Sequence, residues 1–275
     1  MNFSKVRAIR NGIFFFIWLG FLFGPYVVLH IFNYRGRHVV SRLFFKGCLK
    51  LTGIRLNVHG RAHSDTVLFA ANHASYLDIL MLGALLSDSV FVAKAEVSQW
   101  PVFGFLARLA RTIFIQRTGL KALEQTRVLG RHINQGGSLI LFPEGTSTDG
   151  SYVNSFKSSL FASLEFTPHE AWVQPVTLAY ARHKNGLPLA QGCRENFTWF
   201  GEQTLAPHLW RVFGLQGCEV DVVFHEPLHR NHFDNRKHLA NACHQVICDT
   251  LRISLDQSGK PYEGHRDFAF YRAAE

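Results

Sequence analysis

The stretch Val67-Leu-Phe-Ala-Ala-Asn-His-Ala-Ser-Tyr-Leu-Asp78 decides how this chain is organised. Its first part, Val67 to Ala71, is an apolar run typical of a buried β-strand, and its second part supplies a histidine and, five positions later, an aspartate. Residues five apart in one α-helix lie about 140° apart around the axis and cannot face each other. We therefore expect His73 to lie in a loop, just before a helix that begins at Tyr76.

Ser75 and Asp78 fit two hypotheses. As an N-cap, Ser75 would start the helix over residues 76–86, and Asp78 at its third position would tilt back towards the loop that carries His73. A carboxylate there could bind one imidazole nitrogen and leave the other free as a base, which is the base-and-orienter half of a catalytic triad. The same two residues satisfy the S-x-x-D capping pattern, so capping without catalysis is equally compatible with these residues alone.

Positive charge is concentrated at the N-terminal end of the 275-residue chain, whose formal net charge is +9. Residues 1 to 64 contain ten Lys or Arg and no Asp or Glu, and the remainder has 19 basic against 20 acidic residues. A basic flank beside an apolar stretch favours anionic lipid headgroups as partners, and no interleaved basic and aromatic groove indicates nucleic acid. The five cysteines include no C-x-x-C pair, which predicts reduced thiols in a cytosol-facing domain.

An apolar segment of 21 residues, 12–32, contains no Lys, Arg, Asp or Glu and could cover about 31 Å as a helix, roughly the hydrocarbon thickness of a membrane. Basic residues flank it on both sides, so the positive-inside rule gives no orientation. Gly24-Pro25 favours a break that lets two short halves enter the membrane and return, with a single span as the alternative. The amphipathic segment 42–53 would lie on the interface or pack on the globular domain. We expect residues 1–50 to form this membrane anchor.

From Ile54 onward, strand and helix candidates alternate in the pattern of an α/β architecture. We expect one domain over residues 51–255, with a central mixed sheet flanked by helices, and a loosely ordered tail over residues 256–275. Strands are expected at residues 67–71, 90–93, 112–116, 138–142, 172–180 and 219–225. Helices are expected at residues 76–86, 102–110, 120–134, 157–166 and 235–255.

Two further polar clusters lie at the C-terminal ends of strand candidates. Open α/β sheets have their binding sites at this end of the strands. Arg117 follows the strand candidate at 112–116, and Glu144-Gly-Thr-Ser147 follows the one at 138–142. An arginine at a strand end is usually a solvated charge, and a glutamate before glycine is usually part of a turn. Together with His73 and Asp78, however, these clusters indicate one site.

With these residues the chain resembles the glycerolipid acyltransferase family typified by 1-acylglycerol-3-phosphate O-acyltransferase. The four motif blocks of that family occur in order: Asn72-His73-x4-Asp78, Ile113-Phe-Ile-Gln-Arg117, Phe142-Pro-Glu-Gly-Thr146 and Val173-Gln-Pro-Val176. Lys94-Ala-Glu96 also matches a family position between the blocks. The resemblance covers roughly residues 50 to 225 and implies a single acyltransferase domain.

The resemblance implies transfer of a fatty acyl group from an acyl carrier protein or coenzyme A thioester to the free hydroxyl of a lysolipid, at the cytoplasmic face of the inner membrane. His73 would take the hydroxyl proton, a role in which a neutral imidazole typically contributes about 10²–10⁴-fold, and Asp78 would fix its tautomer. The chain contains no G-x-S-x-G elbow, which argues against a serine hydrolase with an acyl-enzyme.

By the same resemblance, Arg117, Glu144, Gly145 and Thr146 would shape the site for the acceptor's headgroup. The guanidinium of Arg117 suits a phosphate, whereas the anionic Glu144 would hold a glycerol hydroxyl or position Arg117. Lys94 could reach a phosphate of the acceptor or the donor. Neither a metal nor a bound cofactor is expected. Four C-terminal histidines are interpreted as surface residues of a loop rather than as metal ligands: His225, His229, His232 and His238.

Ser147 is a departure from the family pattern, which commonly continues Glu-Gly-Thr-Arg. Its presence removes a bidentate phosphate ligand and weakens phosphate recognition. The acceptor is therefore either 1-acylglycerol-3-phosphate or a related lysophospholipid, or else a lyso-ornithine lipid, as in a neighbouring branch of the family. A lipid-binding membrane protein without catalysis is the alternative from another functional class.

Overall fold

The computed structural model describes residues 2–32, 36–100, 104, 107–108, 110–116, 121–167 and 171–256. Within them, an eight-stranded sheet runs in the order β1-β7-β6-β2-β5-β3-β4, with β8 paired to β6. Strand β6 is antiparallel to β7 and β8, and the other pairs are parallel, which confirms the predicted α/β fold with a mixed sheet. The strands are β1 (Arg55–His59), β2 (Thr66–Ala71), β3 (Val90–Lys94), β4 (Ile113–Ile115), β5 (Leu139–Leu141), β6 (Trp172–His183), β7 (Cys218–Phe224) and β8 (Leu228–His229).

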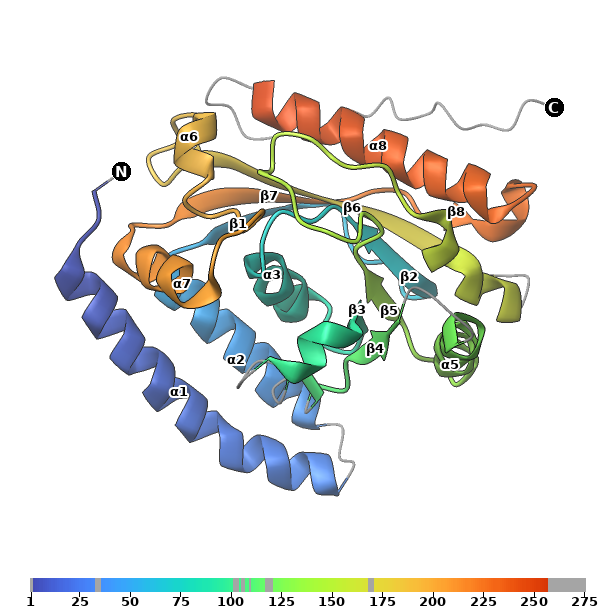
Figure 1. Cartoon of the computed structure of the whole chain (residues 1–275), viewed down its shortest axis with the longest axis horizontal. Helices are drawn as coiled ribbons and strands as arrows, with labels where there is room; N and C mark the ends of the chain where they lie inside the picture. The colour runs from blue at the N-terminus through green and yellow to red at the C-terminus, as the bar shows by residue number, and fades with distance from the viewer. Residues whose placement is uncertain are drawn as a thin grey trace.

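Helices cover both faces of the sheet (Figure 1). The core on one face is formed with α2 (Gly36–Thr52), α3 (Leu77–Leu85) and α7 (Leu205–Gly214). The core on the other face is formed with α5 (Lys121–Asn134), the 3-10 helix η2 (Ser158–Phe166) and α8 (Arg236–Asp256). Shorter elements connect the strands: η1 (Ala95–Gln99), α6 (Gln191–Arg194) and η3 (Arg230–His232).

The N-terminal apolar segment forms one continuous helix, α1 (Lys5–Ile31), so the predicted break at Gly24-Pro25 is wrong. Proline removes only one hydrogen bond of the helix, and Leu22 and Tyr26, on either side of it, line one cavity against α2. Figure 1 shows α1 as a bowed ribbon on the outside of the molecule. By length and composition, α1 could cross a membrane, and only 6% of its most apolar window is buried within the protein.

Helix α2 joins α1 to the sheet domain. It is longer than the predicted segment 42–53, runs back along α1 and packs on α3 (Figure 1). Two close approaches fix it: a Cβ added at Gly47 would lie 2.1 Å from the indole nitrogen of Trp18, and one at Gly83 would lie 2.5 Å from the ring of Phe45. Of the two alternatives for this segment, packing on the globular domain is the one that the structure shows.

Several elements differ from the sequence expectations. Residues 158–166 form a 3-10 helix rather than an α-helix, and β1, β8, α6 and α7 are additional elements. Most of the helix expected at residues 102–110 lies outside the described residues, as do residues 257–275 of the expected tail. All five cysteines are free thiols, as expected, and Cys48, Cys218 and Cys243 are buried.

Candidate active site

The loop between β2 and α3 carries His73 and is tied to the centre of the sheet. Asn72, directly before it, is 2% exposed and bonds the backbone of Leu178 in β6 twice. Its amide nitrogen donates to the Leu178 carbonyl at 2.9 Å, and its oxygen accepts the Leu178 N–H at 2.7 Å. The start of the histidine loop is therefore held by the neighbouring strand.

His73 and Asp78 form a hydrogen-bonded pair, as the spacing predicted. The distance between Nδ1 of His73 and Oδ2 of Asp78 is 2.8 Å. Because a carboxylate only accepts hydrogen bonds, we assign the proton to Nδ1, which leaves Nε2 as a free base. The imidazole is 19% exposed, whereas the carboxylate is fully buried. The ring of His73 stacks on Phe142, with centroids 4.1 Å apart.

Asp78 also caps the helix that follows, so the predicted bond to His73 and the predicted capping contacts occur together. Helix α3 begins at Leu77, one residue later than predicted, and its capping residue Tyr76 makes no side-chain capping bond. The capping contacts come from Ser75, whose hydroxyl accepts the Leu77 N–H at 3.3 Å. Oδ2 of Asp78 in turn accepts the N–H groups of Ser75 at 2.9 Å and Ala74 at 2.7 Å. One carboxylate thus orders the loop and orients the imidazole.

Glu144 holds the same loop from the opposite side. It is 2% exposed, and its two oxygens accept the backbone N–H groups of His73 and Asn154, each at 2.7 Å. Burial raises the pKa of Glu144 to about 8, although these two bonds lower it. The sequence predicted a residue that holds a glycerol hydroxyl or positions Arg117. The structure places its carboxylate on the backbone of the histidine loop, and Arg117, one of the expected partners, lies outside the described residues.

The predicted site residues Gly145, Thr146 and Ser147 directly follow Glu144 in the loop after β5. Thr146 is exposed, and Gly145 adopts a left-handed conformation with φ of 75°. Lys94 is exposed at the end of β3, a strand separated from β2 by β5. The hydroxyl of Ser147 donates to the carbonyl of Trp199. The predicted phosphate ligand Arg117 lies outside the described residues.

Sequence reasoning missed three residues that fix the site. Thr148 donates its N–H to the carbonyl of His73 at 3.0 Å, and Trp199 donates its N–H to the carbonyl of Ala74 at 2.7 Å. Tyr180, fully buried in β6, donates its hydroxyl to Oδ1 of Asp78 at 2.7 Å. The first two act through backbone groups, and Tyr180 lies 102 positions from its partner, so the sequence gives no local signal for them.

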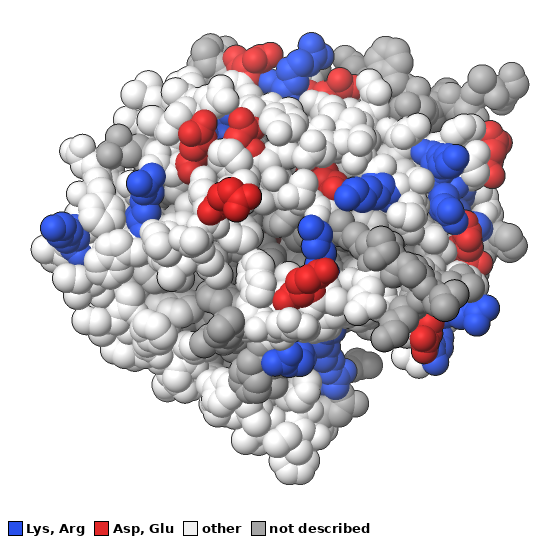
Figure 2. Space-filling model, viewed as in Figure 1, with Lys and Arg blue, Asp and Glu red and all other residues white. Residues whose placement is uncertain are grey.

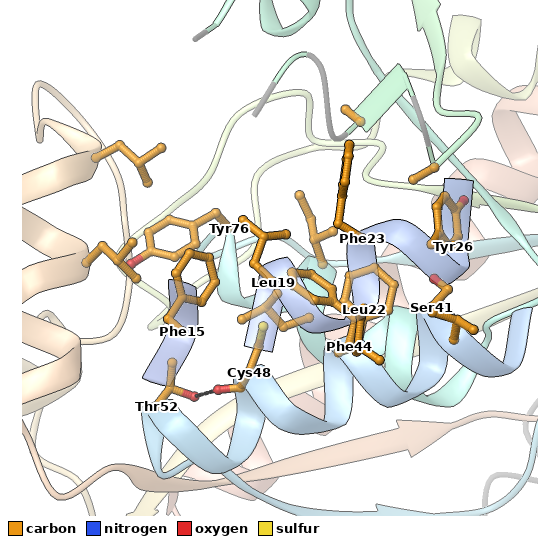
Figure 3. Close-up of a pocket in the computed structure, with 18 of the residues that line it drawn as sticks. Phe15, Leu19, Leu22, Phe23, Tyr26, Ser41, Phe44, Cys48, Thr52 and Tyr76 are labelled. Atoms are coloured by element: carbon orange, nitrogen blue, oxygen red, sulfur yellow. Dashed lines mark hydrogen bonds between the residues drawn. The ribbon is translucent and has the colours of Figure 1, made fainter. Parts of the chain in front are cut away.

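An apolar cavity of about 240 Å³ lies between α1, α2, α3 and α7. Tyr76 lines it and lies three positions after His73. Most of the remaining wall comes from α1, α2 and α7. Phe15 of α1 and Phe44 of α2 are among its residues (Figure 3). A hydrocarbon chain could occupy this space, because the lining is almost entirely apolar.

Metal ligation has no support in the described part of the chain, where no group of three or more His, Cys, Asp or Glu could hold an ion. The prediction that His225 lies on the surface is wrong: its side chain is 8% exposed, and its Nε2 lies 2.8 Å from the hydroxyl of Thr177. Burial lowers the pKa of His225 to about 4, so this ring is neutral in the native state.

Comparison with known proteins identifies the family. The Acyltransferase family model matches residues 55–179. The lyso-ornithine lipid O-acyltransferase of Rhodobacter capsulatus is 38% identical over 73% of this chain and 71% of its own length. The chain belongs to the acyltransferase family. The corresponding enzyme of Rhizobium meliloti is 37% identical to this acyltransferase over 76% of the chain and 73% of its own length.

Two other relatives of this acyltransferase extend the comparison. The 1-acyl-sn-glycerol-3-phosphate acyltransferase of Neisseria meningitidis is 36% identical over 65% of the chain and 68% of its own length. The crystal structure of the 1-acyl-sn-glycerophosphate acyltransferase PlsC from Thermotoga maritima superposes with a TM-score of 0.61, covering 92% of this chain and all of that one. At 20% identity, that likeness shows the shared fold.

Proposed function

We propose that this acyltransferase moves a fatty acyl group from an acyl carrier protein or coenzyme A thioester to the free hydroxyl of a lysolipid, with His73 as the general base. The observation that carries the proposal is the 2.8 Å bond between His73 and the buried Asp78. Nε2 takes the hydroxyl proton as the oxygen attacks the thioester carbonyl. The carbon–sulfur bond then breaks, and the imidazolium returns the proton to the leaving thiolate, so an ester and a free thiol are formed. The reaction needs neither a metal nor a bound cofactor.

A lyso-ornithine lipid is the acceptor that we propose first. The two relatives that act on this lipid match a larger share of the chain than the Neisseria enzyme named for 1-acyl-sn-glycerol-3-phosphate. Ser147 supports the same choice, because its hydroxyl is bonded to the Trp199 carbonyl and provides no charge for a phosphate. Thr146 and Lys94 lie on the exposed side of the strand-end loops, where they would meet the headgroup.

Membrane attachment through α1 fits this reaction, because the acceptor is itself a membrane lipid. The outward side of α1 exposes large apolar residues, with Phe16, Phe21 and Ile31 each 70% exposed. Figure 2 shows that the edge formed by α1 carries few charged side chains. We place the protein at the inner membrane with its site facing the cytoplasm, where acyl carrier thioesters are made. Deleting residues 2–32 should release it into the soluble fraction, and continued sedimentation with membranes would show that another segment anchors it.

The test is acyl transfer from labelled acyl carrier protein and acyl-CoA to lyso-ornithine lipid, 1-acylglycerol-3-phosphate and other lysophospholipids. We expect turnover with lyso-ornithine lipid, loss of at least about 10²-fold in His73→Ala, and undiminished turnover with EDTA present. A folded, membrane-bound protein that binds lysolipid without turnover, in a manner unaffected by His73→Ala, would indicate a lipid-binding protein instead.

The acceptor is tested with a matched pair of variants at position 147. Ser147→Arg should raise activity on 1-acylglycerol-3-phosphate relative to lyso-ornithine lipid, because it adds a guanidinium that can bind a phosphate. Ser147→Ala removes the bond to Trp199 without adding charge and therefore separates the two effects. If both variants behave alike, Ser147 does not decide how phosphate is used. If 1-acylglycerol-3-phosphate is already the preferred acceptor of the unaltered protein, the lyso-ornithine assignment fails while the acyltransferase chemistry stands.

A further inference from the structure

The second oxygen of the Asp78 carboxylate has a partner of its own. Oδ2 accepts three bonds, from His73, Ala74 and Ser75, whereas Oδ1 accepts a bond from the hydroxyl of Tyr180 at 2.7 Å. Both Asp78 and Tyr180 are 0% exposed, so bulk water cannot replace that bond. A buried carboxylate oxygen without a donor is unfavourable, and Tyr180 therefore contributes directly to the state of Asp78.

The phenol of Tyr180 keeps the proton that it donates to Asp78. Burial, and then the adjacent Asp78 carboxylate, raise its pKa well above the ordinary range, so the phenol keeps its proton at any working pH. The side chain of Ser75 lies close enough to the phenol to offset part of that rise in pKa. Its ring lies in β6, whose carbonyl at Tyr180 accepts a bond from the guanidinium of Arg194 at 3.0 Å. Hydrogen bonds thus run from Tyr180 through Asp78 to His73.

We propose that Tyr180 is a positioning residue of the catalytic pair: its hydroxyl fixes the rotation of Asp78 and moderates the carboxylate's hold on the proton of His73. A donor on Oδ1 spreads the negative charge of the carboxylate over both oxygens and weakens the pull of Oδ2 on the imidazole. The imidazolium of His73 is then stabilised less than it would be without this donor. This inference rests on the proposed role of His73 as the base.

The decisive variant is Tyr180→Phe, which removes a single oxygen from a buried ring. Without that donor, Asp78 should hold the imidazolium more tightly, and the acidic limb of the pH profile of kcat/KM should move to higher pH by about 0.5–1 unit. At pH values below the midpoint of that limb, kcat should fall. The KM for the acceptor should stay within about twofold, because Tyr180 does not touch the lysolipid. Tyr152→Phe is the matched control, since Tyr152 is 54% exposed and should leave the profile unchanged.

A second measurement follows His73 without any turnover. The rate at which diethyl pyrocarbonate modifies His73, read by mass spectrometry of its peptide across pH, should show the same shift in Tyr180→Phe, since the ring is 19% exposed. If the unaltered protein turns over no acceptor, the proposed function fails, whereas this titration still decides the role of Tyr180. A folded Tyr180→Phe protein with an unmoved midpoint would overturn the inference.

Ser75→Ala carries the test if Tyr180→Phe does not fold. It leaves the phenol in place and removes the hydroxyl that helps to polarise it, so the midpoint should move in the same direction by a smaller amount. Its loss of the capping bond to Leu77 lowers the melting temperature but does not by itself move a titration midpoint. An unmoved midpoint in Ser75→Ala would then count against the network.

Discussion

Glu144 should make the protein less stable as the pH rises from 6.5 to 8. Its pKa is raised from an ordinary 4.5 to about 8, because the carboxylate is buried. The native state therefore holds this proton more tightly than the unfolded state does. The stability that Glu144 contributes is greatest below pH 4.5 and is lost as the pH rises through 8.

The size of the loss follows from the two pKa values. Between them, each pH unit lowers the free energy of unfolding by about 1.4 kcal/mol, and the curve levels off near pH 8. From pH 6.5 to 8 the expected loss is about 1.5 kcal/mol. The buried rings of His208 and His225, whose pKa values burial lowers to about 4, act mainly below pH 6.5 and leave this window largely to Glu144.

The assay is chemical unfolding in detergent at closely spaced pH values for the unaltered protein, Glu144→Gln and the exposed control Glu202→Gln. Glu144→Gln leaves one of two backbone N–H groups without an acceptor, which lowers stability by about 1–3 kcal/mol at every pH. Because the amide does not titrate, its deficit should shrink by about 1.5 kcal/mol between pH 6.5 and 8. Parallel curves for Glu144→Gln and the unaltered protein would refute the reasoning, and Glu202→Gln should give such parallel curves.

Two further predictions concern packing and acid stability. Gly47→Ala should lower stability by about 1–3 kcal/mol, because the new Cβ would lie 2.1 Å from the indole nitrogen of Trp18 and force α1 away from α2. Gly20→Ala, with nothing within 4 Å, is the matched control in the same thermal unfolding experiment, and equal losses would contradict this packing. His225 should make the protein lose about 2 kcal/mol as the pH falls from 6.5 to 5, because its buried ring, bonded to Thr177, must charge on unfolding. His225→Gln should abolish that part of the acid sensitivity in a series of melts across pH, and an unchanged slope would show that the ring is not neutral in the native state.

The sequence predicted the fold where the signal is local. The segments that form β2, β5 and β6 are rich in apolar residues, which is typical of buried strands. Each of them is a strand close to the expected bounds. The placement of His73 before a helix followed from geometry alone, since five residues within one helix could not bring it to Asp78. The 2.8 Å bond between them confirms that argument.

The elements that were missed lack such a signal. Strand β1 lies at the edge of the sheet, and none of its five residues is buried, so its composition is mixed. Pro207 falls in the first turn of α7, where proline is tolerated. Because proline within a helix usually breaks it, the sequence of this segment did not indicate a helix. The role of Glu144 was missed for another reason: its partners are backbone groups, which no side-chain pattern reveals.

The double role of Asp78 decides how substitutions at this position must be interpreted. Three donors meet on Oδ2, and only one of them belongs to His73, so Asp78→Ala leaves the N–H groups of Ala74 and Ser75 unpaired and destabilises the start of α3. Low activity in that variant would not by itself show a catalytic role.

Asp78→Asn separates the two roles. Its amide oxygen can take the place of Oδ2 and accept all three bonds, while its NH2 group faces the Tyr180 hydroxyl, which can turn to accept. The fold and the orientation of His73 should then persist, with a melting temperature close to that of the unaltered protein. What is lost is the negative charge that stabilises the imidazolium, and kcat should fall by about 10²-fold or more. If Asp78→Asn retains nearly full activity, the carboxylate serves the loop and the helix, and the base strength of His73 must come from elsewhere in the site.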